Sequence, residues 1–174
     1  MKVITCTDKE RSNRVLDLSE TLSAAATTDD AWKAYREALT GIGGKSVVYG
    51  FFPKNLGRSL ASEIVALSSH PEEFNRLYLE EGYIDHDPFA KYVMVEEERS
   101  ISWADPRAEK FSSRRSEFFT NSLKDFGMEF GITIPLRDGT GAKLGGTGIS
   151  LDAPSAREAE SALAFLGPQF EEAA

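Results

Sequence analysis

Residues 128–152 read MEFGITIPLRDGTGAKLGGTGISLD, and this stretch decides the predicted fold. Two segments rich in aliphatic and β-branched residues, Met128–Arg137 and Leu144–Asp152, flank the polar, glycine-rich segment Asp138–Gly141. Such a segment between two strand patterns is typical of a hairpin turn. Because strands joined by a hairpin run antiparallel, we expect a sheet that is mainly antiparallel.

Further strands are predicted nearer the N-terminus. Ser46–Pro53 (SVVYGFFP) is β-branched and aromatic, which is typical of a buried strand. Leu60–Leu67 follows a turn at Asn55–Gly57, and Ser100–Trp103 is a short extended piece. With the two strands of the hairpin, these segments predict a sheet of about five strands.

Helices are predicted before, between and after the strands. Their expected ranges are residues 13–25, about 27–42, Pro71–Glu81, Asp87 to about Glu98, Asp105 to about Asp125, and the segment after Ser155. Thr27 and Thr28 can cap the second helix, and Ser155-x-x-Glu158 has the form of a capping box. The predicted fold class is therefore α/β (α+β): an α-β-α sandwich with helices on both faces of a central sheet, resembling GAF/PAS-like sensor domains with a cavity between sheet and helices.

Length and charge restrict the function. The chain has 174 residues, 20 basic and 28 acidic, for a net charge of −8. We expect one domain over residues 1–174, without a DNA-binding domain, and no direct contact with nucleic acid, because an acidic surface repels phosphates. No apolar run is long enough to span a membrane, and MKVITCTDKERSN lacks the apolar core of a secretory signal, so we expect a cytoplasmic protein.

Motifs for catalysis and metal binding are missing from the sequence. The two histidines and the single cysteine, Cys6, show no zinc-ligand spacing, and no G-x-S-x-G or phosphate-loop motif occurs. We therefore expect no enzyme activity, no metal and no cofactor, apart from a bound small molecule. A hydrolase using Asp87 with His70 is the weakest alternative, because no nucleophile stands beside a base.

One ordered set of residues carries functional information. Phe74 and Tyr78 lie at i and i+4 and share one helix face, and Asp87-Pro88 follows nine residues after Tyr78. Trp103 comes next, followed by G-I-T-I-P-L at residues 131–136. This set resembles the autoinducer-binding domain of LuxR-type quorum-sensing regulators, which bind acyl-homoserine lactones.

The resemblance implies a small-molecule site and a role for each matching residue. Asp87 would accept a hydrogen bond from the amide N–H of the ligand, the Tyr78 hydroxyl would donate to the amide carbonyl, and Trp103 would exclude water from the lactone ring. The other candidate ligand-binding residues are Phe74, His70, Val48, Phe52, Phe89, Phe118, Ser122, Thr133 and Gly148. Taken singly, Tyr78 and Trp103 fit core residues, Asp87 fits a helix cap, and His70 fits a surface or capping residue.

Phe74 departs from the family pattern. The family has Trp at this position, and Phe lacks the indole N–H that would hold the lactone carbonyl. An unmatched buried acceptor costs about 1–3 kcal/mol. Three alternatives follow: a lactone held by another donor, for which His70 is a candidate, a different small molecule, or no ligand. We expect Phe74→Trp to tighten binding of acyl-homoserine lactones.

The resemblance also implies partners. Family members usually continue into a helix-turn-helix module that binds DNA. By the same resemblance, this chain is expected to act as a sensor that folds and dimerises with its ligand, as a homodimer or with a LuxR-type regulator. The alternative is a ligand-independent dimerisation module or anti-activator that pairs with a full-length regulator.

Overall fold

The computed structural model describes residues 17–51, 65–95, 100–138 and 140–173. Its helices and strands follow in this order: α2 (Thr28–Gly41), β1 (Gly44–Phe51), β2 (Val65–Ser68), α3 (Glu72–Glu80), η2 (Tyr83–Asp85), α4 (Pro88–Val95), β3 (Ile101–Ser102), η3 (Pro106–Phe111), α5 (Arg114–Asp125), β4 (Phe130–Arg137), β5 (Lys143–Leu151) and α6 (Ala156–Ala173). Residues 17–24 form a further helix before α2. The predicted fold class is confirmed.

The sheet has five strands in the order β2-β1-β5-β4-β3, and every neighbouring pair is antiparallel. The predicted hairpin is present, because Asp138 N–H donates to the carbonyl of Ala142 at the turn between β4 and β5. β5 lies between β1 and β4, so the N-terminal and C-terminal parts of the chain meet at the centre of the sheet.

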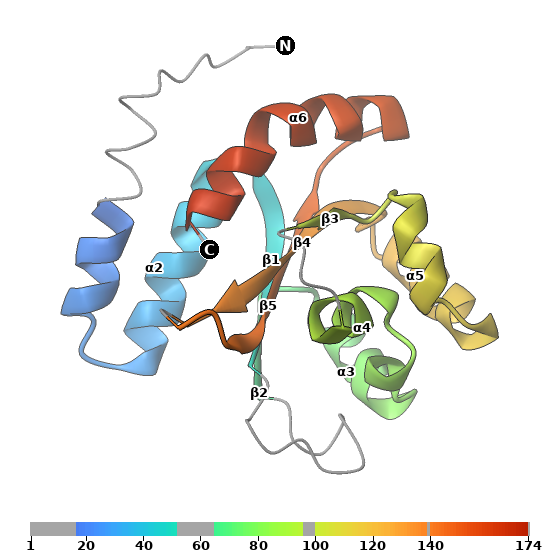
Figure 1. The fold of residues 1–174 in the computed structure, drawn as a ribbon, viewed down its shortest axis with the longest axis horizontal. Helices are drawn as coiled ribbons and strands as arrows, with labels where there is room; N and C mark the ends of the chain where they lie inside the picture. The colour runs from blue at the N-terminus through green and yellow to red at the C-terminus, as the bar shows by residue number, and fades with distance from the viewer. Residues whose placement is uncertain (1–16, 52–64, 96–99, 139, 174) are drawn as a thin grey trace.

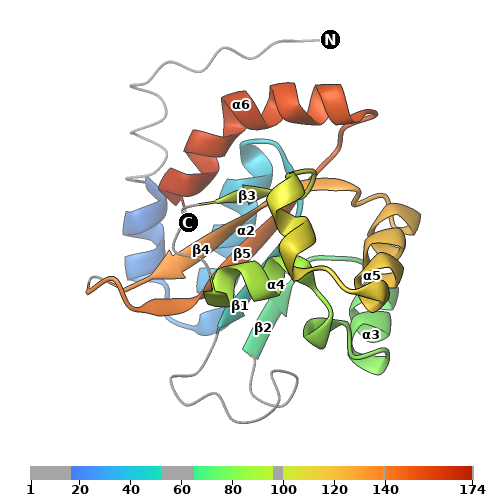
Figure 2. The same ribbon diagram turned by 45° about the vertical axis from the view of Figure 1, so that its right-hand side comes forward.

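Helices cover both faces of the sheet. The helix of residues 17–24, α2 and α6 lie on one side, and α3, α4 and α5 lie on the other (Figures 1 and 2). The predicted cap of α2 is confirmed, since Thr27 Oγ1 accepts from the N–H of Asp30. Ser155 caps α6 in the same way, accepting from the N–H of Glu158. Within the described ranges, no helix is both long enough and apolar enough to cross a membrane.

The two faces of the central strands carry side chains of different size. The face toward α2 and α6 holds a core of large residues, which includes Val47, Tyr49, Ile132, Ile134, Ile149 and Leu151. Alternate positions on the same strands point to α3, α4 and α5 and are mostly small: Ser46, Val48, Gly146, Gly148, Ser150, Gly131 and Thr133. Because side chains alternate along a strand, large side chains cover the face toward α2 and α6, and small ones leave room for other side chains on the face toward α3, α4 and α5.

The prediction of one long helix from Asp105 to Asp125 was wrong. Asp105 caps only the short helix η3, which ends at Phe111. Ser113 then starts α5 with a capping box, its hydroxyl accepting from the N–H of Ser116 while the Ser116 hydroxyl accepts from the N–H of Ser113. Two capping residues within eight positions therefore divide the segment. The predicted strand Leu60–Leu67 lies partly outside the described residues. Its described end, from Val65, belongs to the observed strand β2, which runs to Ser68.

Candidate functional site

The structure joins Tyr78 to Asp87. The Tyr78 hydroxyl, on the last turn of α3, donates a hydrogen bond of 2.9 Å to Asp87 Oδ2. The other carboxylate oxygen, Oδ1, accepts from the backbone N–H groups of Phe89 (2.8 Å) and Ala90 (3.1 Å) at the start of α4. Asp87 is therefore both a helix cap and the acceptor for a partly buried tyrosine, so one carboxylate ties α3 to α4.

Burial controls the protonation of this pair. It raises the pKa of Asp87 above its ordinary value, and the hydrogen bonds from Ala90, Tyr78 and Phe89 act against that rise, as does the charge of Lys91. Burial also raises the pKa of Tyr78 well above its usual range, and the Asp87 charge adds to the effect. Tyr78 is thus a stable hydrogen-bond donor and Asp87 an acceptor that is held in place from several sides.

Trp103 covers the small-residue face of the sheet. Its Nε1–H donates to Thr133 Oγ1 at 2.8 Å, and its ring stacks on Phe89 with centroids 5.5 Å apart. A Cβ added to Gly131 would lie 2.7 Å from the indole, and one added to Gly148 would lie 3.6 Å from it. Glycine at these two positions therefore lets the indole lie close to the strands.

An aromatic cluster fills the space between α3 and α5. Phe74 is buried and lies 5.5 to 6.4 Å, between ring centroids, from His70, Tyr78, Phe119 and Phe126. The predicted candidates Phe74 and Phe89 thus belong to one buried cluster, and the partly buried Tyr78 packs against it.

Phe119 is a central residue of the cluster that was absent from the predicted candidates. It is buried, and its ring lies within 6.4 Å of the rings of Phe74, Tyr78, Tyr83 and Phe89. The periodicity of α5 could have found it, because the buried residues Ser116, Phe119, Ser122 and Leu123 follow helical spacing.

Phe118 lies elsewhere than expected. Phe118 is 61% exposed, whereas it was expected among the residues that line the ligand site. Helical geometry explains the correction, since Phe119 occupies the inward position and its neighbour turns toward solvent. Ser122 is buried and within 3.1 Å of the Tyr83 hydroxyl, so it belongs to the cluster wall. Phe52 lies outside the described residues.

His70 sits in a buried polar cluster and is not a surface residue. Its Nδ1 lies 2.7 Å from Ser46 Oγ, which in turn lies 2.6 Å from Ser150 Oγ and 3.5 Å from Met128 Sδ. Burial lowers the pKa of His70 to about 4, so the ring is neutral at pH 7. Because its hydrogen-bond partner is Ser46, while Asp87 bonds Tyr78, the structure does not pair His70 with Asp87.

Val48 and Gly148 are direct partners across β1 and β5, and Gly148 lies beside Trp103. The structure therefore brings together Phe74, Tyr78, Asp87, Phe89, Trp103 and Thr133, with His70 at one side and Val48 and Gly148 on the sheet. No group of three or more His, Cys, Asp and Glu side chains suited to a metal ion occurs in the described part of the chain.

A family model described as "Autoinducer binding domain" matches residues 27–173. The chain belongs to the autoinducer-binding domain family. The resemblance inferred from the ordered residues Tyr78, Asp87, Trp103 and Gly131 is thereby confirmed. The match starts at the cap of α2 and ends in α6, so it includes the sheet and both helical layers of this autoinducer-binding domain.

Solved structures support the same fold. The autoinducer-binding domain is similar to the N-acylhomoserine lactone dependent LuxR family transcription factor CepR2 from Burkholderia cenocepacia, with 21% identity, a TM-score of 0.72, and 95% and 92% of the two chains covered. SdiA in complex with octanoyl-rac-glycerol has 15% identity and a TM-score of 0.65, over 94% of this chain and 69% of the other. The VqsR LBD domain from Pseudomonas aeruginosa has 14% identity, a TM-score of 0.55, and 92% and 94% coverage. No curated protein sequence gives a significant match.

Proposed function

We propose that this autoinducer-binding domain binds an uncharged amphiphile of the acyl-homoserine lactone type between the small-residue face of the sheet and α3, α4 and α5. The observation that carries the proposal is the partly buried Tyr78–Asp87 pair, which Phe89 connects to Trp103. A carboxylate held by three donors offers a strong acceptor to a ligand amide N–H, and water exclusion strengthens that bond. The aromatic cluster around Phe74 supplies the apolar surroundings of an acyl chain.

The buried charge also limits the class of ligand. Asp87 would repel a carboxylate placed beside it, and no described cation forms an ion pair with it. A neutral lactone with an amide avoids that repulsion, which favours it over a fatty acid. His70 is neutral and lies against Phe74, so it can offer a hydrogen bond where family members have a tryptophan N–H.

Thermal unfolding with a series of acyl-homoserine lactones tests this function. A ligand at a hundredfold excess over its Kd stabilises the folded state by about 2.7 kcal/mol, which raises Tm by about 5–10 °C for a domain of this size. The shift should be lost in Asp87→Asn, which removes the carboxylate. It should be kept in Asp85→Asn, an exposed carboxylate two residues away. A shift of equal size in both variants would contradict the role of Asp87.

A ligand-independent module is the second candidate function. It is favoured by the dense packing of this region, where Trp103 lies against Gly131 and Phe74 contacts four rings. It predicts that no lactone of the series changes Tm and that the protein binds a LuxR-type regulator without ligand. Titration of a labelled regulator in the absence of lactone distinguishes the two functions.

We also propose that two copies of the domain associate through α6, as a homodimer, with pairing to a LuxR-type regulator as the alternative. Leu163 and Leu166 of α6 pack against the core, whereas Phe165 is 40% exposed on the same helix. An exposed aromatic residue on the long C-terminal helix supports an interface there. Sedimentation equilibrium should show a dimer that Phe165→Ser weakens and Glu160→Ser, at another exposed position, does not.

A further inference from the structure

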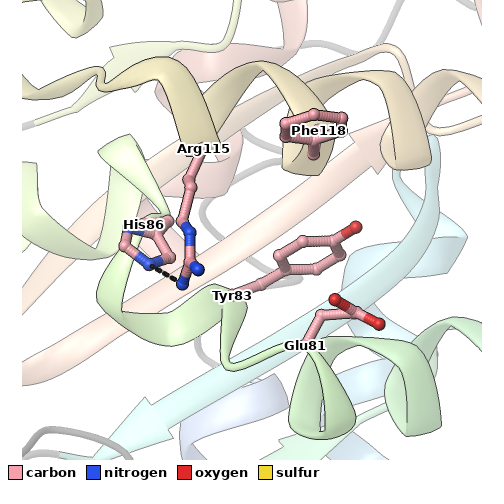
Figure 3. A pocket seen from close by; sticks show the side chains of 5 residues that line it. All are labelled: Glu81, Tyr83, His86, Arg115 and Phe118. Atoms are coloured by element: carbon pink, nitrogen blue, oxygen red, sulfur yellow. Dashed lines mark hydrogen bonds between the residues drawn. The ribbon is translucent and has the colours of Figure 1, made fainter.

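A pocket lies at the surface between η2 and α5, apart from the proposed lactone site. Its volume is about 290 Å³, and Glu81, Tyr83, His86, Arg115 and Phe118 line it. Figure 3 shows the Tyr83 ring between the Arg115–His86 pair on one side and Glu81 on the other, with Phe118 on α5 above it. The volume suits a small molecule, since ligand pockets start at about 300 Å³.

Arg115 gives the pocket a cation with free hydrogen-bonding capacity. Its Nη1 donates to Nε2 of His86 at 3.3 Å, a contact that needs the unprotonated ring nitrogen. Among the described residues no carboxylate lies within ion-pair distance of Arg115, whereas Arg107 and Arg76 each pair with an acid. The guanidinium has five N–H groups, so it can still bind a carboxylate through two of them.

Phe118 and Tyr83 give the pocket apolar walls. Phe118 is 61% exposed and lies one helical turn after Arg115, so both side chains project from the same face of α5. The Tyr83 ring is buried, and its hydroxyl lies 3.1 Å from Ser122 Oγ, which fixes its orientation. An exposed aromatic side chain beside an arginine is a combination enriched in recognition sites.

The backbone around the pocket is held in place before any ligand binds. Ser116 Oγ donates to the carbonyl of His86 at 2.5 Å, which joins α5 to the segment after η2. The capping box of Ser113 and Ser116 fixes the first turn of α5, where Arg115 lies. A preformed site loses less entropy on binding.

The charges select the ligand. Glu81 lies across Tyr83 from Arg115, so a second negative charge on the ligand would be repelled, whereas an N–H or O–H group there would find an acceptor. We propose that this pocket is a second binding site of the chain and takes a small monocarboxylate that has an apolar body and a hydrogen-bond donor, as in an N-acyl amino acid. The inference does not depend on lactone binding at Asp87.

The two proposed sites carry opposite charges, and the Tyr83 ring contacts both of them. Asp87 makes the inner site unfavourable for an anion, whereas Arg115 makes the outer pocket favourable for one. The Tyr83 ring contacts Tyr78 and Phe119 of the inner cluster, with centroids 6.2 and 5.8 Å apart. A carboxylate in the outer pocket therefore contacts the same tyrosine that backs the inner site.

Titration of the ¹⁵N-labelled chain with N-hexanoylglycine, followed by amide chemical shifts at low salt, tests the proposal. We expect saturable shifts centred on Tyr83, His86 and Arg115, and none with the uncharged N-hexanoylglycinamide. Arg115→Gln should weaken binding by at least about tenfold, because a charge-assisted bond is lost, and Arg114→Gln should change it less than about twofold. Phe118→Ala should weaken binding by about threefold to tenfold through loss of apolar contact.

Three results would overturn the proposal: equal binding of the amide and the acid, equal affinity in the Arg115 and Arg114 variants, or shifts centred on Trp103. Circular dichroism of each variant checks that it is folded, and Arg115→Lys, which keeps the charge, serves as a second variant. A failure of lactone to bind at Asp87 would leave these outcomes unchanged, so the two sites are tested separately.

Discussion

Tyr78 and Asp87, nine residues apart, are joined by a partly buried hydrogen bond of 2.9 Å between the tyrosine hydroxyl and carboxylate Oδ2. The bond connects the end of α3 to the start of α4. It also lowers the pKa of Asp87, against the effect of burial. The same carboxylate thus stabilises the local fold and presents the polar group on which the proposed lactone site depends.

Removing that hydroxyl should destabilise the domain. Tyr78→Phe takes away a hydrogen bond to a carboxylate, and we expect the free energy of unfolding to fall by about 1.5–3 kcal/mol in urea denaturation at pH 8. Tyr83→Phe is the matched control, because its hydroxyl meets only the neutral Ser122 Oγ and its loss should cost about 0.5–1.5 kcal/mol. An equal or smaller loss in Tyr78→Phe would argue against an ionised partner.

Stability should fall on acidification because of His70. Burial lowers the pKa of its imidazole from 6.5 to about 4, so between these values the unfolded chain binds a proton that the folded protein does not. The free energy of unfolding should therefore decrease as pH falls from about 6.5 to about 4, by up to about 3 kcal/mol. Asp87, whose pKa is raised, acts in the opposite direction.

Two histidine variants isolate this effect. His70→Gln should flatten the pH dependence relative to the parent protein, and His86→Gln, on the other histidine of the chain, should not. Urea denaturation at intervals from pH 7 to pH 4 measures both. The prediction fails if the parent protein and His70→Gln lose stability in parallel.

A methyl group at Gly131 should be incompatible with the position of Trp103. The Cβ of Gly131→Ala would lie 2.4 Å from the carbonyl oxygen of Ile149 and 2.7 Å from the indole. We expect a loss of at least about 2 kcal/mol and a red shift of tryptophan fluorescence as the indole moves. Gly41→Ala, at the end of α2 with nothing within 4 Å, should leave stability unchanged or raise it by up to about 1 kcal/mol. Similar Tm values for both variants would disprove the contact.

Phe74→Trp should separate ligand affinity from stability. The indole N–H should tighten lactone binding, measured by isothermal titration. The ring of Phe74 is already enclosed by four aromatic neighbours, so a larger side chain should cost about 1–3 kcal/mol of unfolding free energy. Phe74→Leu, which adds no donor, controls for repacking. Tighter binding in the leucine variant would contradict a role for the N–H.

Tyr35→Phe should stabilise the opposite side of the sheet. The Tyr35 hydroxyl is buried and makes no hydrogen bond of good geometry within the described part of the chain. Burial raises its pKa to about 12, and the nearby Thr147 side chain acts against that rise. Removing the hydroxyl should raise the free energy of unfolding by about 1 kcal/mol at pH 7. The gain should increase above pH 10, where the unfolded tyrosine ionises and the folded one does not. A loss of stability would indicate that the hydroxyl has a partner.

Local signals in the sequence predicted the hairpin, the cap at Thr27 and the antiparallel sheet. The division between η3 and α5 was missed, because Asp105-Pro106 is a strong helix start that hides the second start at Ser113. The choice of Phe118 was a separate error, because the buried positions of α5 place Phe119 on its inward face.

Long-range contacts were beyond the reach of sequence patterns. Ser46 and Ser150 are 104 residues apart and meet only because β1 pairs with β5, so the environment of His70 had no local signal. Tyr78 and Asp87 were both identified, but their bond to each other depends on how the chain turns at Gly82 between α3 and η2, where φ is 61°.

The alternation of large and small residues on the central strands has a consequence for evolution. A one-residue slip of β5 would move Ile149 and Leu151 to the face that now holds Gly146, Gly148 and Ser150, and would move those small residues into the core. The slip would empty the core and block the site in a single step. Selection for folding and selection for recognition therefore act on the same strand register, and neither property can drift without the other.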